Sequence, residues 1–212
     1  MLLVSGLLFT ISGNAQDPQF TQFYANPLYL NPAFAGSKEC PRVHLNYRNQ
    51  WPAIQGQFVS YSASYDQHID AISGGLGGLV VADQAGNGTL QTINASAMYA
   101  YTLPVSENFS IKAGFQATYF QKSINWDDLK FGDMIDPRYG FIYQTNETPG
   151  TNQVNGADFS AGFLGYSKYV FAGVSVHHLT EPSESFFEND NAKLYRKYTV
   201  HAGGNIPLEE GY

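Results

Sequence analysis

The chain has 212 residues and a formal net charge of −7, with 14% charged and 15% aromatic residues. Soluble domains usually carry about a quarter charged residues, so this composition favours a β-rich protein with little polar surface. The negative charge leaves no basic patch for nucleic acid, and a single cysteine, Cys40, excludes an internal disulfide framework.

Residues 1–15 are predicted to form a signal peptide. An apolar run extends from Leu2 to Ile11, and small residues at 13–15 precede the expected cleavage before Gln16. A buried N-terminal strand or helix is the alternative. The run is too short to cross a bilayer as a helix, and no later segment is a continuous apolar stretch of about twenty residues. A membrane-spanning role must therefore come from strands that close on themselves.

Residues 16–42 show no strand periodicity. Pro18, Pro27 and Pro32 block regular pairing, while the many aromatic residues need burial. We expect an extended or briefly helical arm, periplasmic or inside the lumen of a barrel. The alternative is a mobile leader.

Most of the eight later strand segments alternate apolar and small polar residues with a period of two, which places successive side chains on opposite faces of a strand. The segment 74–82 is instead glycine-rich and permissive. The hairpin over 89–122, with its turn at 104–108, shows the pattern over the longest stretch. The predicted strands are 43–50, 58–66, 74–82, the two arms of the 89–122 hairpin, 158–165, 169–179 and 197–206.

The connections between these strands predict a barrel. They are short after the second, fourth and sixth strands, and long and polar after the fifth and seventh, at 123–156 and 180–196. Outer-membrane barrels place short turns in the periplasm and long loops outside. We therefore predict an all-β fold, a transmembrane antiparallel up-and-down β-barrel formed by residues 43–212. A soluble β-sandwich is the alternative, but it gives no reason for loop length to alternate.

The end of the sequence resembles its middle. Residues 206–212 and 103–109 share the order apolar, proline, apolar, polar, acidic, small, aromatic, and Phe109 begins a strand. Tyr212 is then expected to begin a ninth strand, so the sequence is interpreted as an N-terminal fragment with about eight strands. The alternative is an eight-stranded barrel in which the eighth strand pairs with the first.

Several segments resemble the PorP/SprF family of the type IX secretion system in Bacteroidetes. The most specific are the asparagine-proline motif, with Asn31, Pro32, Ala33 and Gly36, and the HLTEP run over 178–182. The other matching segments are 15–37, 42–51, 58–66, 101–119, 124–141, 170–182 and 198–208. The resemblance implies an outer-membrane barrel and not an enzyme.

Catalytic and metal-binding chemistry have little support in the residues. No GxSxG or HExxH pattern occurs, and no cofactor is expected. His177 and His178 are adjacent, so we expect their side chains on opposite faces of a strand, unable to share a metal without a bulge. His44 and His201 are interpreted as polar lining of the lumen.

The two long loops carry the candidate partner-binding residues. Aromatic side chains beside acids are common anchors of protein interfaces. Paired acids in the first loop could hold calcium, although the spacing does not fit an EF-hand; the favoured alternative is a lid held by aromatic packing and by pairing of acids with Arg138. The candidates are Trp126, Asp127, Asp128, Phe131, Arg138, Tyr139, Phe186 and Phe187.

The resemblance implies a function in protein export. A family member would bind or anchor secreted surface proteins, including gliding adhesins, through their C-terminal sorting domains. Its partners would be this cargo, other type IX components and outer-membrane lipid. A diffusion porin and a structural or adhesive barrel remain as alternatives, although the aromatic arm of 16–42 would plug a porin.

Overall fold

The computed structural model describes residues 17–18, 20–53, 56–187 and 192–204. The predicted signal peptide and the repeated motif over 206–212 lie outside these residues.

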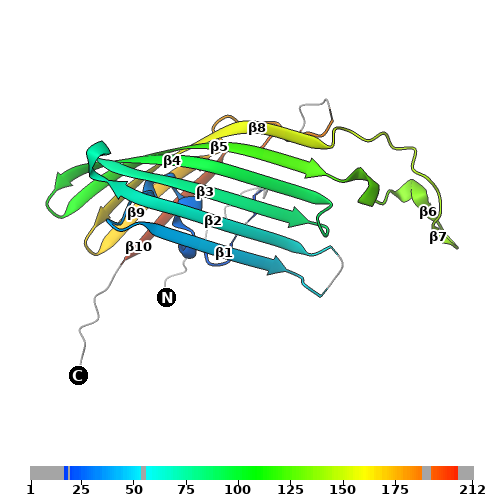
Figure 1. Ribbon diagram of the computed structural model, residues 1–212, viewed down its shortest axis with the longest axis horizontal. Coiled ribbons are helices and arrows are strands. Elements are labelled where there is room, and N and C mark those ends of the chain that lie inside the picture. Colours follow the sequence, from blue (N-terminus) through cyan, green and yellow to red (C-terminus); the bar gives the residue numbers. More distant parts are fainter. Residues whose placement is uncertain (1–16, 19, 54–55, 188–191, 205–212) are drawn as a thin grey trace, which may run out of the picture.

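Eight long antiparallel strands form one sheet in the order β1-β2-β3-β4-β5-β8-β9-β10, in which neighbours in sequence are neighbours in space (Figure 1). The strands are β1 (Arg42–Gln50), β2 (Phe58–Ile69), β3 (Gly74–Ala85), β4 (Leu90–Ser106), β5 (Phe109–Ile124), β8 (Gln153–Ser167), β9 (Val170–His177) and β10 (Lys197–Gly204).

The sheet has one apolar and one polar face, because the side-chain alternation persists through every long strand. In β2, Tyr61 is 48% exposed while the adjacent Ser62 is 4% exposed. In β5, Phe115 and Tyr119 are exposed while Gln116 is buried. Aromatic and aliphatic residues thus cover the outer face. The inner face carries many hydroxyl, amide and charged groups, together with the apolar side chains that pack against the arm.

All eight predicted strands are present, with ends that differ by a few residues. The largest correction concerns the turn predicted at 104–108. Strand β4 continues to Ser106, the turn is formed by Glu107 and Asn108, and the register shifts between Pro104 and Ser106. Such a bulge absorbs an extra residue in one strand, so the proline lies inside the strand without ending it.

The two longest connections lie at the same end of the sheet. At one end, here called the turn end, lie 70–73, 107–108 and 168–169; at the other, the loop end, lie 51–57, 86–89, 125–152 and 178–196. The loop at 125–152 contains a small hairpin, β6 (Ile135–Asp136) and β7 (Gly140–Phe141), which projects beyond the sheet (Figure 1). The two longest connections share the loop end, as predicted.

The long sheet is open in the described part of the chain. β1 pairs only with β2, and β10 pairs only with β9, so the alternative in which the eighth strand closes on the first is not observed. A curved up-and-down sheet with an apolar exterior and a polar interior is a section of β-barrel wall. Within the described residues, no helix is both long and apolar enough to pass through a membrane.

Residues 20–41 lie on the inner face of this wall (Figure 1). They form three short helices, η1 (Phe23–Ala25), α1 (Pro27–Leu30) and η2 (Pro32–Phe34). Proline occupies the first position of α1 and of η2, where a missing amide hydrogen costs nothing. Leu28 and Ala35 pack with Leu79, Val81 and Met98 in a small apolar core between arm and sheet.

Candidate functional site

Three glycines on three strands form a cradle for the arm. Gly75 of β3 lies against Gly36, Gly114 of β5 lies against Ala33, and Gly162 of β8 lies against Asn31. A methyl group at any of these strand positions would overlap arm atoms. Gly36 has φ +59, a backbone conformation that favours glycine. The asparagine-proline motif therefore has a structural reason: it is the part of the arm that touches the sheet most closely.

Asn31 joins the arm to two strands at once. Its side-chain nitrogen donates to the carbonyl oxygens of Phe163, at 3.1 Å, and of Val174, at 3.2 Å. Its side-chain oxygen accepts the Ala33 amide at 2.8 Å and so caps η2. The residue is fully buried, where an unpaired amide would be costly.

Buried charges hold the arm next to the cradle. The guanidinium of Arg42 makes two bonds with the carboxylate of Asp66, which also accepts the Gly36 amide at 2.8 Å. The ammonium of Lys112 donates to the carbonyl oxygens of Ala35 and Gly36, both at 2.8 Å. Asp66 and Lys112 are fully buried; buried charges persist when they are paired and hydrogen-bonded.

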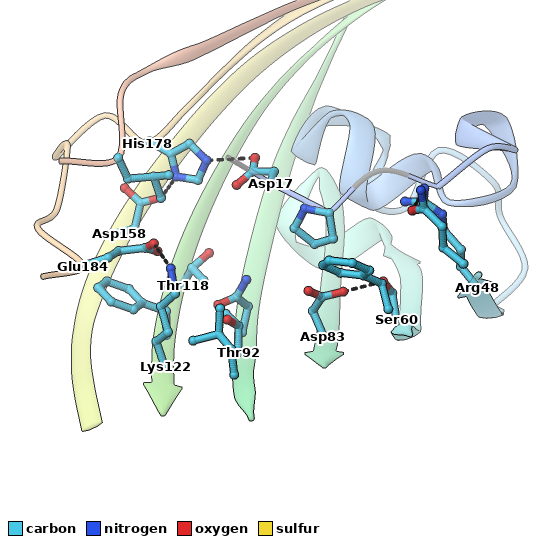
Figure 2. A pocket seen from close by; sticks show the side chains of 17 residues that line it. Asp17, Arg48, Ser60, Asp83, Thr92, Thr118, Lys122, Asp158, His178 and Glu184 are labelled. Carbon is cyan, nitrogen blue, oxygen red and sulfur yellow. Dashed lines mark hydrogen bonds and ion pairs between the residues drawn. The ribbon is translucent and has the colours of Figure 1, made fainter. Parts of the chain in front are cut away.

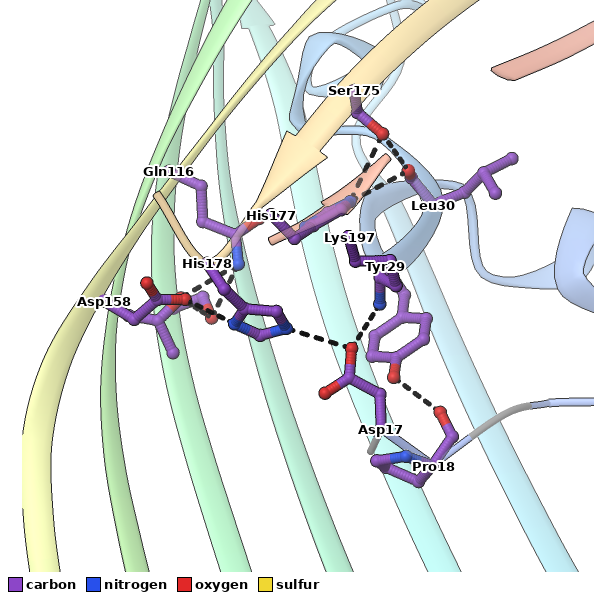
Figure 3. Close-up of polar contacts among 12 residues, drawn as sticks. Asp17, Pro18, Tyr29, Leu30, Gln116, Asp158, Ser175, His177, His178 and Lys197 are labelled. Atoms are coloured by element: carbon purple, nitrogen blue, oxygen red, sulfur yellow. Dashed lines mark hydrogen bonds and ion pairs between the residues drawn. The ribbon is translucent and has the colours of Figure 1, made fainter. Parts of the chain in front are cut away.

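A second polar cluster lies inside the lumen, on the loop-end side of the cradle, where His178 reaches Asp158 of β8 (Figure 3). The carboxylate of Asp17 pairs with the ammonium of Lys197 and lies 3.0 Å from Nε2 of His178. The other ring nitrogen of His178 lies 2.8 Å from Asp158, whose second oxygen accepts the Thr180 hydroxyl at 2.8 Å. The cluster connects the start of the arm to β8, to β10 and to the loop after β9.

The charges of this cluster stabilise one another. Burial opposes the charged form of His178, but its hydrogen bonds to Asp158 and Asp17 outweigh burial and raise the pKa of His178 to about 9. Burial likewise opposes the charged form of Asp17, yet the hydrogen bond from His178 and the charge of Lys197 hold the pKa of Asp17 well below its usual range. Both groups are therefore charged at neutral pH.

The prediction that His177 and His178 face opposite sides is wrong. His178 follows the end of β9 and has φ +59, so the alternation of the strand does not extend to it. Both side chains lie on the inner side, with ring centroids 6.4 Å apart (Figure 3). They take different partners: Nε2 of His177 lies 3.2 Å from the Leu30 carbonyl oxygen.

A cavity of about 390 Å³ opens beside the cluster (Figure 2). Charged side chains around the cavity have partners on other segments. The Lys122 ammonium donates to the Glu184 carboxylate at 2.7 Å, and the Ser60 hydroxyl donates to the Asp83 carboxylate at 2.5 Å. Both bonds link different strands or a strand and a loop. The cavity has a mixed lining at the loop end of the lumen, where Phe58, Phe120 and Leu194 lie beside the polar groups.

Three of the predicted aromatic residues, Trp126, Phe186 and Phe187, form one cluster between the two long loops. The ring of Trp126 lies 6.3 Å from that of Phe186 and 5.6 Å from that of Phe187. The Trp126 indole also donates to the Thr151 carbonyl at 3.3 Å. These three residues attach one loop to the other. Asp127 and Asp128 lie in the same turn as Trp126, where their partner is Asn125.

The remaining predicted loop residues lie on or beside the projecting hairpin, separate from the Trp126 cluster. Tyr139 is 75% exposed, and Phe131 begins the turn before β6, its amide 3.3 Å from the Met134 sulfur. The expected pairing of an acid with the Arg138 side chain is not present among the described residues; instead, the Asp136 carboxylate accepts the backbone amides of Arg138 and Tyr139. These bonds lower the pKa of Asp136.

The described residues contain no group of three or more histidine, cysteine or acidic side chains arranged to hold a metal ion. In the first long loop, Asp133 accepts bonds from Thr145 and Asn146, and Asp136 accepts the hairpin amides and the Tyr143 hydroxyl. Asp133 and Asp136 thus have partners within the loop.

The family model that matches this chain covers residues 12–212 and describes the type IX secretion system membrane protein PorP/SprF. The chain belongs to the PorP/SprF family. Neither the curated proteins nor the solved structures contain a significant match to it. The family assignment agrees with the resemblance noted in the sequence and makes this PorP/SprF chain a membrane component of a secretion system.

The sequence predicts the arm motif but does not show the sheet surface against which this motif packs. Gly75, Gly114 and Gly162 lie in three strands, and nothing in their local sequence marks them as a common surface. The sequence also does not show the pairing of Asp17 with Lys197, which spans 180 positions. One sequence feature does indicate such a contact surface: a small or charged residue at an inward position of an otherwise regular strand, as at Gly114 and Lys112.

Proposed function

We propose that this PorP/SprF chain is an outer-membrane barrel of type IX secretion that binds or anchors secreted surface proteins through their C-terminal sorting domains. The family match over 12–212 carries the proposal. Secreted gliding adhesins are the expected cargo, and other type IX components are the expected neighbours. The role is one of binding, without catalysis.

The wall suggests an orientation. Its outer face is covered by apolar side chains suited to outer-membrane lipid, such as Val80, Phe115 and Phe163. Short turns gather at one end and the longest connections at the other, which in outer-membrane barrels are the periplasmic and external ends. The loop end is accordingly external in this proposal.

The projecting hairpin is the proposed contact with cargo. Tyr139, Phe141 and Tyr143 are all more than half exposed, and aromatic residues of this kind anchor protein interfaces. The Trp126 cluster has a different role, since it holds the two loops together and so positions the hairpin. Arg138 and the nearby acids supply the polar rim.

A diffusion porin is disfavoured by the arm. Residues 20–41 occupy the inner face, fixed by the glycine cradle and by buried charges. We expect the purified full-length protein to show no large steady conductance in a planar bilayer. A large open-channel conductance would contradict the plugged-receptor proposal.

The binding role is tested by complementation of a strain that lacks the protein. Tyr139→Ala combined with Phe141→Ala is expected to reduce surface retention of cargo bearing C-terminal sorting domains, with unchanged barrel abundance. Thr148→Ala, in the same loop and also exposed, is the matched control. Normal export and retention in the strain lacking the protein would instead indicate a structural or adhesive barrel.

A further inference from the structure

The C-terminal part of the arm lies at the turn end of the sheet. Gly36 packs against Gly75, the second residue of β3, and β3 begins at the turn end. The carbonyl oxygen of Gly36 accepts from Lys112, close to the start of β5, which also begins there. Strand β1 then starts from the same end at Arg42.

The N-terminal part of the arm lies nearer the opposite end. Asp17 pairs with Lys197, the first residue of β10, and with His178, which directly follows β9. His178 reaches Asp158 of β8, so both contacts lie inside the lumen, on the loop-end side of the Asn31 contacts. Asp17 also lines the loop-end cavity together with Gln50 and Glu184 (Figure 2).

Between these ends, the arm follows the lumen in order. The hydroxyl of Tyr29 donates to the Pro18 carbonyl at 2.5 Å. The Leu30 carbonyl accepts the Ser175 hydroxyl at 2.8 Å within β9. Asn31 then reaches Phe163, in the half of β8 nearer the turn end, and Val174, in the middle of β9. Residues later in the arm therefore contact the wall closer to its turn end.

We propose that the arm runs lengthwise along the lumen toward its outer mouth, so that the start of the arm at Asp17 forms part of the surface offered to secreted proteins. The external position rests on the orientation in the proposed function. The threading itself rests on two independent anchors, the ion pairs of Asp17 at one end and the contacts of Gly36 at the other.

Cysteine labelling of the full-length protein in intact cells tests this proposal. The native Cys40 is exposed and precedes β1 at the turn end, so the wild type reports on the periplasmic side. Thr21→Cys in a Cys40→Ser background reports on the arm: Thr21 is exposed and lines a groove with Arg48, Lys197 and Thr199 near the loop end. Thr148→Cys in the same background marks the long loop.

A membrane-impermeant maleimide is applied before and after outer-membrane permeabilisation, with denatured protein as the reference for full labelling. We expect Thr21→Cys and Thr148→Cys to react fully on intact cells, and Cys40 to react only after permeabilisation. If Thr148→Cys reacts on intact cells and Thr21→Cys does not, the threading proposal is overturned and the orientation stands. If Cys40 reacts on intact cells and Thr148→Cys does not, the proposed orientation is overturned, and the threading stands only if Thr21→Cys follows Thr148→Cys.

Discussion

Asn31 and Gly162 meet so closely that the side-chain amide of the first fills the space where a side chain of the second would lie. The two residues are far apart in sequence, and the contact exists only because the arm lies on the inner face of the wall. The same relationship links Ala33 to Gly114 and Gly36 to Gly75. The position of the arm therefore requires glycine at these three strand positions, just as it requires the motif in the arm.

Adding one methyl group to the cradle should loosen the arm. At Gly114 the new carbon of a Gly114→Ala variant would meet backbone atoms of Pro32 and Ala33, which cannot rotate away. We expect a loss of about 1–3 kcal/mol in unfolding free energy, typical of overpacking. Gly132→Ala is the matched control, because its new carbon would meet nothing within 4 Å. Thermal unfolding of the purified barrel measures both; equal stability of the two variants would contradict the cradle.

Removing the Asn31 side chain should lower the free energy of unfolding more than removing an exposed side-chain amide does. Asn31→Ala loses bonds to Phe163, Val174 and Ala33 in a fully buried site. We expect a destabilisation of roughly 2–4 kcal/mol, since buried groups are left unpaired. Asn152→Ala, at an exposed loop position, should change stability by less than about 0.5 kcal/mol. Denaturant titration compares the two, and similar midpoints would count against Asn31 as an anchor.

The Asp17 and His178 pairing should depend on pH. The pKa of His178 is raised from 6.5 to about 9, so its contribution is complete below pH 6.5 and is lost as the pH rises through 9. Lys197 still pairs with Asp17 there, so we expect partial loosening of the arm, seen as faster labelling of Thr21→Cys in purified protein. In a His178→Asn variant this step between pH 7 and 9 should be absent. A wild-type rate that, once corrected for thiol ionisation, does not change over this range would contradict a charged His178.

Trp126 and Tyr139 should have separable effects. Trp126→Ala removes the ring that contacts Phe186 and Phe187, so limited proteolysis of the loop at 125–152 should accelerate. Tyr139→Ala changes an exposed side chain and should leave the proteolysis rate unchanged while it weakens cargo retention. If the two variants behaved identically in both assays, Trp126 would not have a positioning role distinct from the contact role of Tyr139.

A charge on the outer face should impair folding into lipid. Ala97 lies on that face near the middle of β4, and Ala97→Lys is expected to cost about 2–4 kcal/mol at the bilayer midplane. Thr148→Lys in the loop at 125–152 is the control and should fold like the wild type. The folded fraction in phospholipid vesicles measures the difference; full folding of Ala97→Lys would argue against lipid contact at this position.

Much of the wall follows from the sequence because a strand repeats every two residues. Tyr61, Ala63 and Tyr65 alternate with serines, and no competing period fits. Two features departed from this rule for local reasons. Pro104 lies inside a strand because a bulge accommodates it, and His178 leaves the alternation because its φ is positive.

The site was harder to predict than the wall. The loop aromatics were identified from composition, but only the structure separates Trp126, Phe186 and Phe187 from the exposed hairpin. The cradle depends on three glycines in three strands, and the Asp17 pairing depends on where the arm lies. Contacts of this kind leave no periodic pattern, because they are set by the approach of two separate surfaces.

The anchoring of Asn31 also has a consequence for how the molecule assembles. Its partners Phe163 and Val174 lie 132 and 143 positions later, so the arm can complete these contacts only after much later strands are in place. Contacts so distant in sequence form slowly. We therefore expect the arm, with its exposed Phe23 and Tyr24, to be among the last parts of the described chain to reach its final position.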